Sequence, residues 1–172
     1  MLRPPVNDND QKFGGKNTTV ELVEFGDYQC PHCGHAYPLL KRLMQEMQEQ
    51  MTFVFRNFPL AEAHPFATAA ALAAEAAAHQ GKFWEMHDMI FENQRKLSNN
   101  IFLDFAASLQ LDENKFISHW KNEKTLEKVE KDFESGVRSW VNGTPTFFIN
   151  GNLLSTYDGS YESLKSAVTA LI

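Results

Sequence analysis

The sequence contains very little cysteine: only Cys30 and Cys33 occur in 172 residues. A chain of this length can bury a sizeable core as one domain, so cross-links are not needed for folding. A disulfide between these two residues would close a loop of about four residues, which removes little chain entropy, roughly 2 kcal/mol against about 3 for a 15-residue loop. A disulfide between Cys30 and Cys33 would therefore stabilise the fold only slightly.

The sequence also lacks a basic run, a long apolar run and a secretory signal. Its net charge is -6, with acidic and basic residues interspersed, so we expect no nucleic-acid partner. No stretch reaches the ~18 apolar residues of a membrane span. Residues 1–17 show no basic end followed by an apolar stretch, so we expect a cytoplasmic protein; a periplasmic or extracytoplasmic location is the alternative if a leader was removed.

The first third of the chain predicts an arm followed by a βαβ unit. Residues 1–17 are polar and punctuated by proline and glycine, and we expect a mobile or loosely draped arm. In residues 18–61, the run "TVELVEFGDY" predicts a buried strand, "GHAYPLLKRLMQEMQEQ" an amphipathic helix, and "MTFVFRNFPL" a second strand. Strand, helix and strand imply a parallel pair and an α/β fold.

The rest of the chain predicts a helical block and then a return to strands. Residues 62–140 begin with an alanine-rich segment and predict four or five helices, one of them capped by Asp112. Residues 141–172 predict a hairpin turning at Asn150-Gly151 and a closing helix capped by Ser160. We therefore assign 18–61 and 141–172 to one core and 62–140 to an inserted helical domain.

The stretch "QCPHCG" places the two cysteines where the first strand passes into the first helix. Cys30, Cys33, His32 and His35 are all possible metal ligands, and zinc or copper binding or delivery is the alternative function. Structural zinc sites usually join two separated ligand pairs, and this sequence has no second cysteine pair. We therefore predict no metal site.

Thiol-disulfide exchange suits this position better. A helix N-terminus stabilises a thiolate, so Cys30 is expected to be the nucleophile and Cys33, one turn further, the more buried resolving thiol. Pro31 suits the first helical position, and His32 adds a donor or a cation near the Cys30 sulfur. Stabilising the reduced form makes the disulfide a stronger oxidant.

Two distant features strengthen the redox interpretation. In "GTPTFF" a strand begins through Thr144-Pro145, an X-Pro bond that can be cis, and Thr144 could offer its backbone to an extended substrate. Glu24 is an acid within the apolar strand that precedes the cysteines, and alternation places it on one face with Leu22 and Gly26. If buried near Cys33, it would have a raised pKa and could exchange protons with that thiol.

"VEFGDYQCPHCGHAYP", followed at a distance by "GTPTFFING", resembles the DsbA-like thiol-disulfide oxidoreductases. The resemblance covers nearly the whole chain after the arm and implies a thioredoxin-like fold with an inserted all-helical domain. It implies that Cys30 is the exposed nucleophile, Cys33 the resolving thiol, His32 the thiolate-stabilising residue, Pro145 the cis-proline and Glu24 the buried acid.

The implied function is protein dithiol-disulfide oxidation or reduction through a mixed disulfide, with no cofactor. The expected partners are cysteine-containing protein substrates and a redox partner that resets the pair. Some relatives pair the buried acid with a lysine on the next strand, which "MTFVF" lacks. The isomerase branch dimerises through an added N-terminal domain that the 17-residue arm cannot supply, so we expect a monomer. The other histidines, at 64, 79, 87 and 119, are expected to be surface or core residues on helices.

Overall fold

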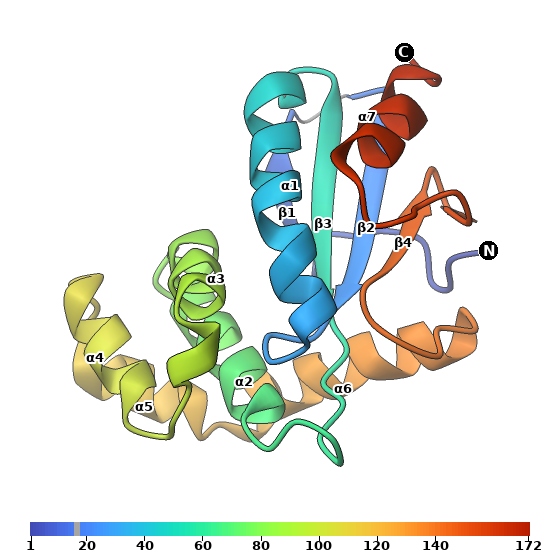
Figure 1. The fold of residues 1–172 in the computed structure, drawn as a ribbon. Helices are drawn as coiled ribbons and strands as arrows, with labels where there is room; N and C mark the ends of the chain where they lie inside the picture. The colour runs from blue at the N-terminus through green and yellow to red at the C-terminus, as the bar shows by residue number, and fades with distance from the viewer. Residues whose placement is uncertain (16–17) are drawn as a thin grey trace.

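The computed structural model describes residues 1–15 and 18–172, which form one central sheet flanked by helices (Figure 1). The described strands are ordered β1-β3-β2-β4-β5 in the sheet. β2 and β3 are parallel, as predicted, and the other neighbouring strands are antiparallel. The strand bounds are Gln11–Gly14 for β1, Val20–Gly26 for β2, Met51–Asn57 for β3, Thr146–Ile149 for β4 and Asn152–Leu153 for β5.

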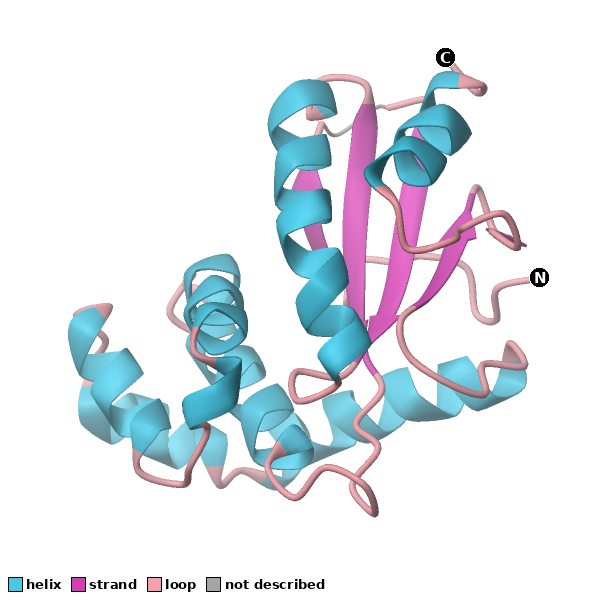
Figure 2. Cartoon of the chain, in the orientation of Figure 1, coloured by secondary structure: helices cyan, strands magenta, loops and turns pink. Residues whose placement is uncertain are grey.

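Helices α1 (Pro31–Met47) and α7 (Tyr161–Thr169) lie side by side on one face of the sheet (Figure 2). α1 buries Leu40, Leu43 and Met44 at helical spacing against this face. The predicted cap of the closing helix is confirmed, because the Ser160 side chain accepts a hydrogen bond from the backbone N–H of Ser163. The βαβ unit therefore places the start of α1 at the carboxyl end of β2.

The predicted helical block is confirmed between β3 and β4. Asp112 caps one of its helices by accepting from the backbone N–H of Lys115. The described helices are α2 Ala67–Ala78, α3 Phe83–Glu92, the short 3-10 helix η1 Gln94–Lys96, α4 Ile101–Ser108, α5 Glu113–Trp120 and α6 Glu123–Arg138. We retain the division of the chain at residues 62 and 140 as a proposal.

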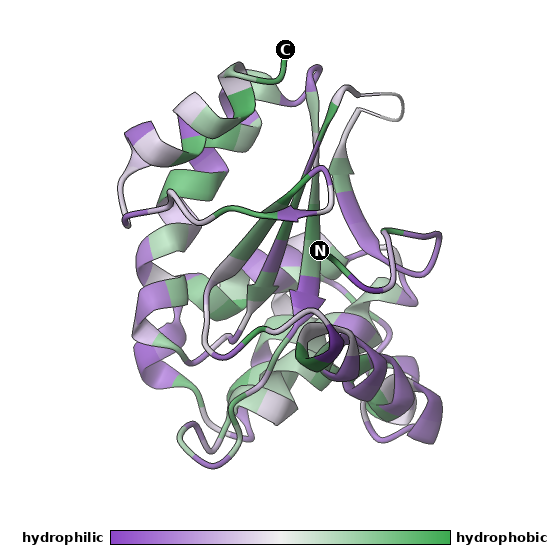
Figure 3. Cartoon of the chain, turned by 90° about the vertical axis from the view of Figure 1, so that its right-hand side faces the viewer, coloured by the Kyte–Doolittle hydropathy of each residue, from purple (hydrophilic) through white to green (hydrophobic). Residues whose placement is uncertain are grey.

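The two faces of the sheet bury different side chains because strand residues alternate. The strands carry many of the hydrophobic residues, which are green in Figure 3. Leu22 and Phe55 face α1 and the cysteines, whereas Val23, Phe25 and Phe148 face the other side. The C-terminal half of α6 lies against that other face, where a Cβ on Gly136 would come 3.1 Å from Phe25 Cδ1. The sheet is thus covered on both faces.

The prediction of a loosely draped N-terminal arm is wrong for the described part of residues 1–17. Residues 11–14 form β1 and pair with β3, and Leu2 is only 3% exposed. The Arg56 guanidinium donates to both carboxylate oxygens of Asp10, at 2.8 and 2.9 Å, and to the backbone carbonyls of Pro4 and Pro5. A buried arginine on β3 therefore holds the arm; positions 16 and 17 lie outside the described residues.

The predicted hairpin is confirmed: β4 and β5 pair on either side of Asn150 and Gly151, whose φ angles are +46° and +79°. Positive φ at both positions is the requirement that makes Asn-Gly a turn signal. None of the helices in residues 1–15 and 18–172 combines the length and the apolar character that a bilayer crossing needs.

Candidate active site

The two cysteines occupy the first turn of α1, as predicted. Cys30 is the N-cap residue, with φ -68° and ψ 124°, and Pro31 is the first residue of the helix. Both thiols are free, and Cys33 is fully buried. Cys30 is the more accessible of the two but is only 5% exposed, so the expectation of an exposed nucleophile is wrong.

The surroundings of Cys30 favour its thiolate. A hydrogen bond from the Cys33 thiol is the largest cause that lowers the Cys30 pKa, to about 5, against the opposing effect of burial. The Thr144 side chain and the backbone N–H groups of Cys33 and His32 add to this lowering. α1 has no side-chain cap, and the thiolate serves as the acceptor for these free helix N–H groups.

His32 lies beside Cys30 at the start of α1, as predicted, but it stabilises the Cys30 thiolate through its backbone and not through its ring. Its side chain is exposed, and its backbone N–H, rather than its ring, is among the causes that lower the Cys30 pKa. The CPHC sequence therefore stabilises the Cys30 thiolate first through the Cys33 thiol and then through the helix-start amides, and residue 32 takes part through its backbone N–H.

Cys33 and Glu24 form the buried side of the site. Burial is the main cause that raises the Cys33 pKa well above its usual value, and the charges of Glu24 and Cys30 contribute. Glu24 is 1% exposed on β2, and burial followed by the charge of Cys30 raises its pKa to about 8. Glu24 Oε1 is buried without a hydrogen-bond partner among the described residues. The carboxyl is thus free to exchange a proton near neutral pH.

The loop before β4 meets the cysteines, as the Thr-Pro pattern indicated. The Thr144-Pro145 peptide bond is cis. The Cys30 thiol donates to the Thr144 carbonyl across 3.3 Å, and the two residues are 114 positions apart in the chain. β2 and β4 are neighbours in the sheet, and this pairing brings the two loops together.

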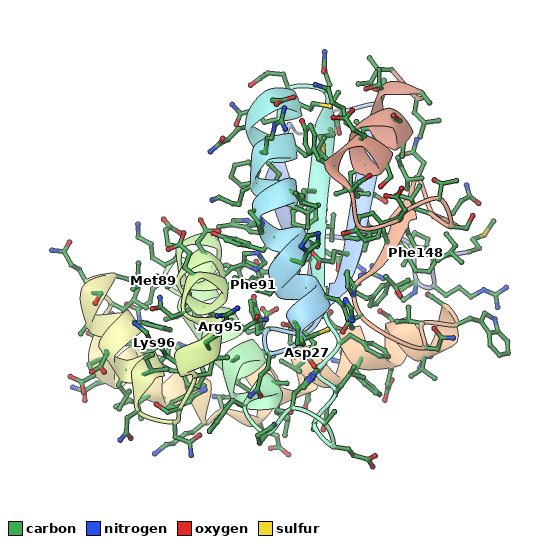
Figure 4. All side chains as sticks on the ribbon, in the orientation of Figure 1. Asp27, Met89, Phe91, Arg95, Lys96 and Phe148 are labelled. Carbon is green, nitrogen blue, oxygen red and sulfur yellow. The ribbon has the colours of Figure 1, made fainter. Side chains whose placement is uncertain are left out.

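Asp27 organises the loop between β2 and α1, and sequence reasoning did not single it out as a functional residue (Figure 4). Its carboxylate accepts from the backbone N–H of Gln29 at 2.7 Å and of Leu60 at 2.8 Å, and it lies 2.8 Å from His64 Nδ1. Its own backbone N–H donates to Cys33 Sγ at 3.4 Å. His64 lies in a loop, so the expectation that it sits on a helix is wrong.

Tyr157 was also missed, because it lies in the loop between β5 and α7 and carries no motif. Burial raises its pKa to about 12, with added effects from the charges of Glu24 and Cys33. Its ring packs edge-on against Phe147, at 4.8 Å between centroids, and Phe147 is the β4 neighbour of Glu24. Tyr157 therefore lines the same face of the sheet as the buried acid.

Metal binding gains no support from this geometry. In the described part of the chain, no three histidine, cysteine, aspartate or glutamate side chains gather closely enough to hold an ion. His35 is engaged elsewhere, with its Nε2 2.9 Å from the carbonyl oxygen of Gly159. The site instead unites Cys30, Cys33 and Glu24 with the Thr144-Pro145 loop.

A reactive dithiol at the start of a helix, facing a cis-proline loop on a sheet interrupted by helices, defines a protein of the thioredoxin class with a DsbA-like architecture. The family profile described as thioredoxin matches residues 7–170. The chain belongs to the thioredoxin family.

Solved structures with this fold include oxidised BdbD from Bacillus subtilis, with a TM-score of 0.85, 22% identity, and coverage of 96% of this chain and 94% of that one. The thiol-disulfide exchange protein alpha-DsbA2 from Wolbachia pipientis gives a TM-score of 0.85, 22% identity, and coverage of 96% and 89%. The predicted thioredoxin-like fold with inserted helices is confirmed.

Curated relatives include a protein from Salinispora arenicola named Na(+)/H(+) antiporter NhaA 1, 40% identical over 99% of this chain and 26% of that protein. Another, from Herminiimonas arsenicoxydans, is named Na(+)/H(+) antiporter NhaA and is 36% identical over 100% of this chain and 27% of that protein. The chain thus spans about a quarter of the length of these relatives.

Proposed function

We propose that this chain is a protein dithiol-disulfide oxidoreductase that uses Cys30 and Cys33 as its redox pair. The observation that carries the proposal is the contrast between the two thiols: the Cys30 pKa is lowered to about 5, while the Cys33 pKa is raised well above its usual value. One thiol can attack as a thiolate at neutral pH while the other is held protonated until it is needed.

In the reducing direction, the Cys30 thiolate attacks one sulfur of a substrate disulfide, and the other substrate sulfur leaves as a thiolate and takes a proton. Cys33 then gives its proton to the Glu24 carboxylate and attacks the Cys30 sulfur. The Cys30–Cys33 disulfide forms, and the second substrate sulfur leaves as a thiolate and takes the proton held on Glu24. Two electrons have then passed to the substrate with two protons, one from Cys33 through Glu24 and one from water. Oxidation of a substrate dithiol is the same sequence reversed.

The substrate-facing side of the site is formed by Thr144 and Pro145. In this proposal an extended, cysteine-containing polypeptide lies along the loop before β4, close to the Cys30 sulfur. Pro145 has no N–H to compete for the thiolate, and Pro31 likewise presents none at the start of α1. The partners are cysteine-containing proteins and a redox partner that resets the pair; the cytoplasmic location and the monomeric state stay predictions from the sequence.

The antiporter activity named for the curated relatives is not assigned to this chain. The chain corresponds to about a quarter of each relative.

The test is the equilibrium of the Cys30–Cys33 pair in graded glutathione buffers, with the oxidised fraction read by thiol alkylation and mass. We expect a reversible two-electron transition, and a potential toward the oxidising end of about -120 mV would show a disulfide donor. A potential near about -270 mV would show a reductase on the same fold. Absence of any reversible transition would contradict the proposal.

Two variants separate the roles of the cysteines. Cys30→Ser should remove exchange with a disulfide-containing protein, whereas Cys33→Ser should form a mixed disulfide that is resolved slowly and can be isolated. If Cys33→Ser turns over its substrate as fast as the wild type, Cys33 is not the resolving thiol.

A further inference from the structure

A glutamine of the helical insert contacts the backbone of the cysteine loop directly. Gln94 is the first residue of η1, which Figure 4 marks through the next two residues, Arg95 and Lys96. Its side-chain Nε2 donates to the carbonyl oxygen of Cys30 at 2.8 Å and to that of Tyr28 at 3.0 Å. One amide group therefore ties together the two ends of the turn that leads into α1.

Side chains of the helical insert also pack against the turn that leads into α1. The ring of Phe91, on α3, lies 4.9 Å from the ring of Tyr28 between centroids, and the Tyr28 hydroxyl lies 3.0 Å from His87 Nδ1. Tyr28 and His87 are both buried, and burial lowers the pKa of His87 to about 3, so this contact is between neutral groups at physiological pH. Gln94 is the member of this set that reaches Cys30 itself.

The first turn of α1 leaves space for this amide only because residue 34 is glycine. A Cβ on Gly34 would lie 2.9 Å from Gln94 Cδ and closer still to Gln94 Oε1. A side chain at residue 34 would therefore push the Gln94 amide away from the Cys30 carbonyl. The absence of a side chain at Gly34, directly after CPHC, therefore leaves the space that the Gln94 amide of the insert occupies.

We propose that Gln94 is a positioning residue of the redox site, which holds the Cys30 N-cap conformation so that the helix-start N–H groups face the reactive sulfur. The inference rests on the proposed redox function and adds to it a role for the inserted helices. The Cys30 carbonyl also accepts from the backbone N–H of Gly34 at 3.0 Å, the first hydrogen bond of α1. Gln94 thereby fixes the geometry of the residue whose thiolate those amides stabilise.

The test is the titration of the Cys30 thiolate, followed by ultraviolet absorbance of the reduced protein, in Gln94→Ala and in Gly34→Ala. We expect the Cys30 pKa to rise by about one unit in both, which is roughly tenfold less thiolate below the midpoint. The oxidised fraction at a fixed glutathione ratio should rise, because the reduced form loses stabilisation. Gln94→Glu, which keeps the shape but replaces the donating N–H₂ by an oxygen and adds a negative charge, should raise the Cys30 pKa at least as much as Gln94→Ala.

Gln80→Ala is the matched control. Gln80 is a half-buried glutamine of the same insert whose amide also makes two backbone hydrogen bonds, to Asp112 O at 3.1 Å and from Asp112 N at 2.9 Å, away from the cysteines. Gln80→Ala should lower the melting temperature by about as much as Gln94→Ala does and leave the Cys30 titration unchanged.

Three outcomes would overturn one claim or the other. If the Cys30 pKa in Gln94→Ala equals that of the wild type, Gln94 does not influence the Cys30 thiolate and contributes to the structure of the loop only. An equal shift in Gln80→Ala would show that the insert acts only through overall stability. If the wild type shows no redox transition with glutathione, the proposed function fails, and the role of Gln94 fails with it. If Gln94→Ala does not fold, the Cys30 titration of Gly34→Ala tests the same proposal, because its added Cβ displaces the Gln94 amide.

Discussion

The backbone carbonyl of Thr144 and the thiol of Cys30 form a 3.3 Å hydrogen bond across the active site. The hydroxyl of the same threonine is buried and has no hydrogen-bond partner among the described residues while Cys30 is a thiol. A Cys30 thiolate offers that hydroxyl an acceptor, and the Thr144 side chain is among the causes that lower the Cys30 pKa. The threonine before Pro145 therefore contacts the sulfur with its backbone and stabilises the charge with its side chain.

Thr144→Val should raise the Cys30 pKa and make the disulfide a weaker oxidant. Valine keeps the shape and the backbone carbonyl but removes the hydroxyl that the thiolate would accept from. Stability of the reduced protein at acidic pH should change by less than about 1 kcal/mol, because the lost hydroxyl has no partner there. The measurement is the Cys30 titration together with the glutathione equilibrium.

Thr144→Ser is the control, since it restores the hydroxyl without the methyl group and should return the Cys30 pKa toward the wild-type value. If valine and serine have the same effect, the methyl group or the loop conformation, rather than the hydroxyl, sets the thiolate stability.

The two cysteines should differ in how their alkylation depends on pH. With a Cys30 pKa near 5, its reaction with iodoacetamide should change little between pH 6 and 8, because the thiolate predominates throughout. Cys33 in Cys30→Ser should react slowly over the same range, since burial keeps it protonated. Peptide mass analysis of the alkylated sites distinguishes them; a steep rise in Cys30 reactivity toward pH 8 would contradict the predicted thiolate.

Glu24→Gln should stabilise the reduced protein at neutral and alkaline pH but not at acidic pH. The folded Glu24 has a pKa raised to about 8 by burial, so over the range between its ordinary pKa and that value the folded state binds a proton that the unfolded state has released. Wild-type stability therefore falls as pH rises through this range. Glutamine is neutral at every pH, and its gain should be on the order of 3 kcal/mol at pH 7.

Urea unfolding of both reduced proteins at pH 4, 6 and 8 measures this difference. Resolution of the mixed disulfide should slow in Glu24→Gln, because Cys33 loses its proton acceptor. A stability difference that does not depend on pH would show that Glu24 titrates near its ordinary value in the folded state.

Local patterns in the sequence predicted the central part of the fold. The apolar strand before Cys30, the amphipathic spacing after Cys33 and the Asn150-Gly151 turn each reflect a short-range preference, and each was confirmed. The residue pattern and the family resemblance identified Thr144-Pro145 as a substrate-binding loop, a role that requires this loop to meet the cysteines. That meeting depends on the pairing of β2 with β4, which a single sequence only suggests.

Several of the contacts that were missed join a polar side chain to backbone groups. Gln94 is one polar residue in the segment "ENQRKLSNN", and its partners on the cysteine loop are backbone carbonyls, which leave no trace in residue identity. Asp27 likewise binds backbone N–H groups. The role of β1 was missed because its four residues alternate only briefly, and because its anchor is a buried charge on another strand.

The Arg56–Asp10 pair anchors the N-terminal segment to the sheet. Arg56 and Asp10 are 2% and 4% exposed at their side chains, and Asp10→Ala leaves the guanidinium buried without its counter-charge. Removing one partner of a buried pair costs about 3–5 kcal/mol, so the free energy of unfolding should fall by about that amount. Asp8→Ala is the control, because Asp8 is fully exposed in its 3.7 Å pair with Lys12 and should cost less than about 1 kcal/mol. If the two alanine variants unfold at the same urea concentration, the segment does not stabilise the fold through Arg56.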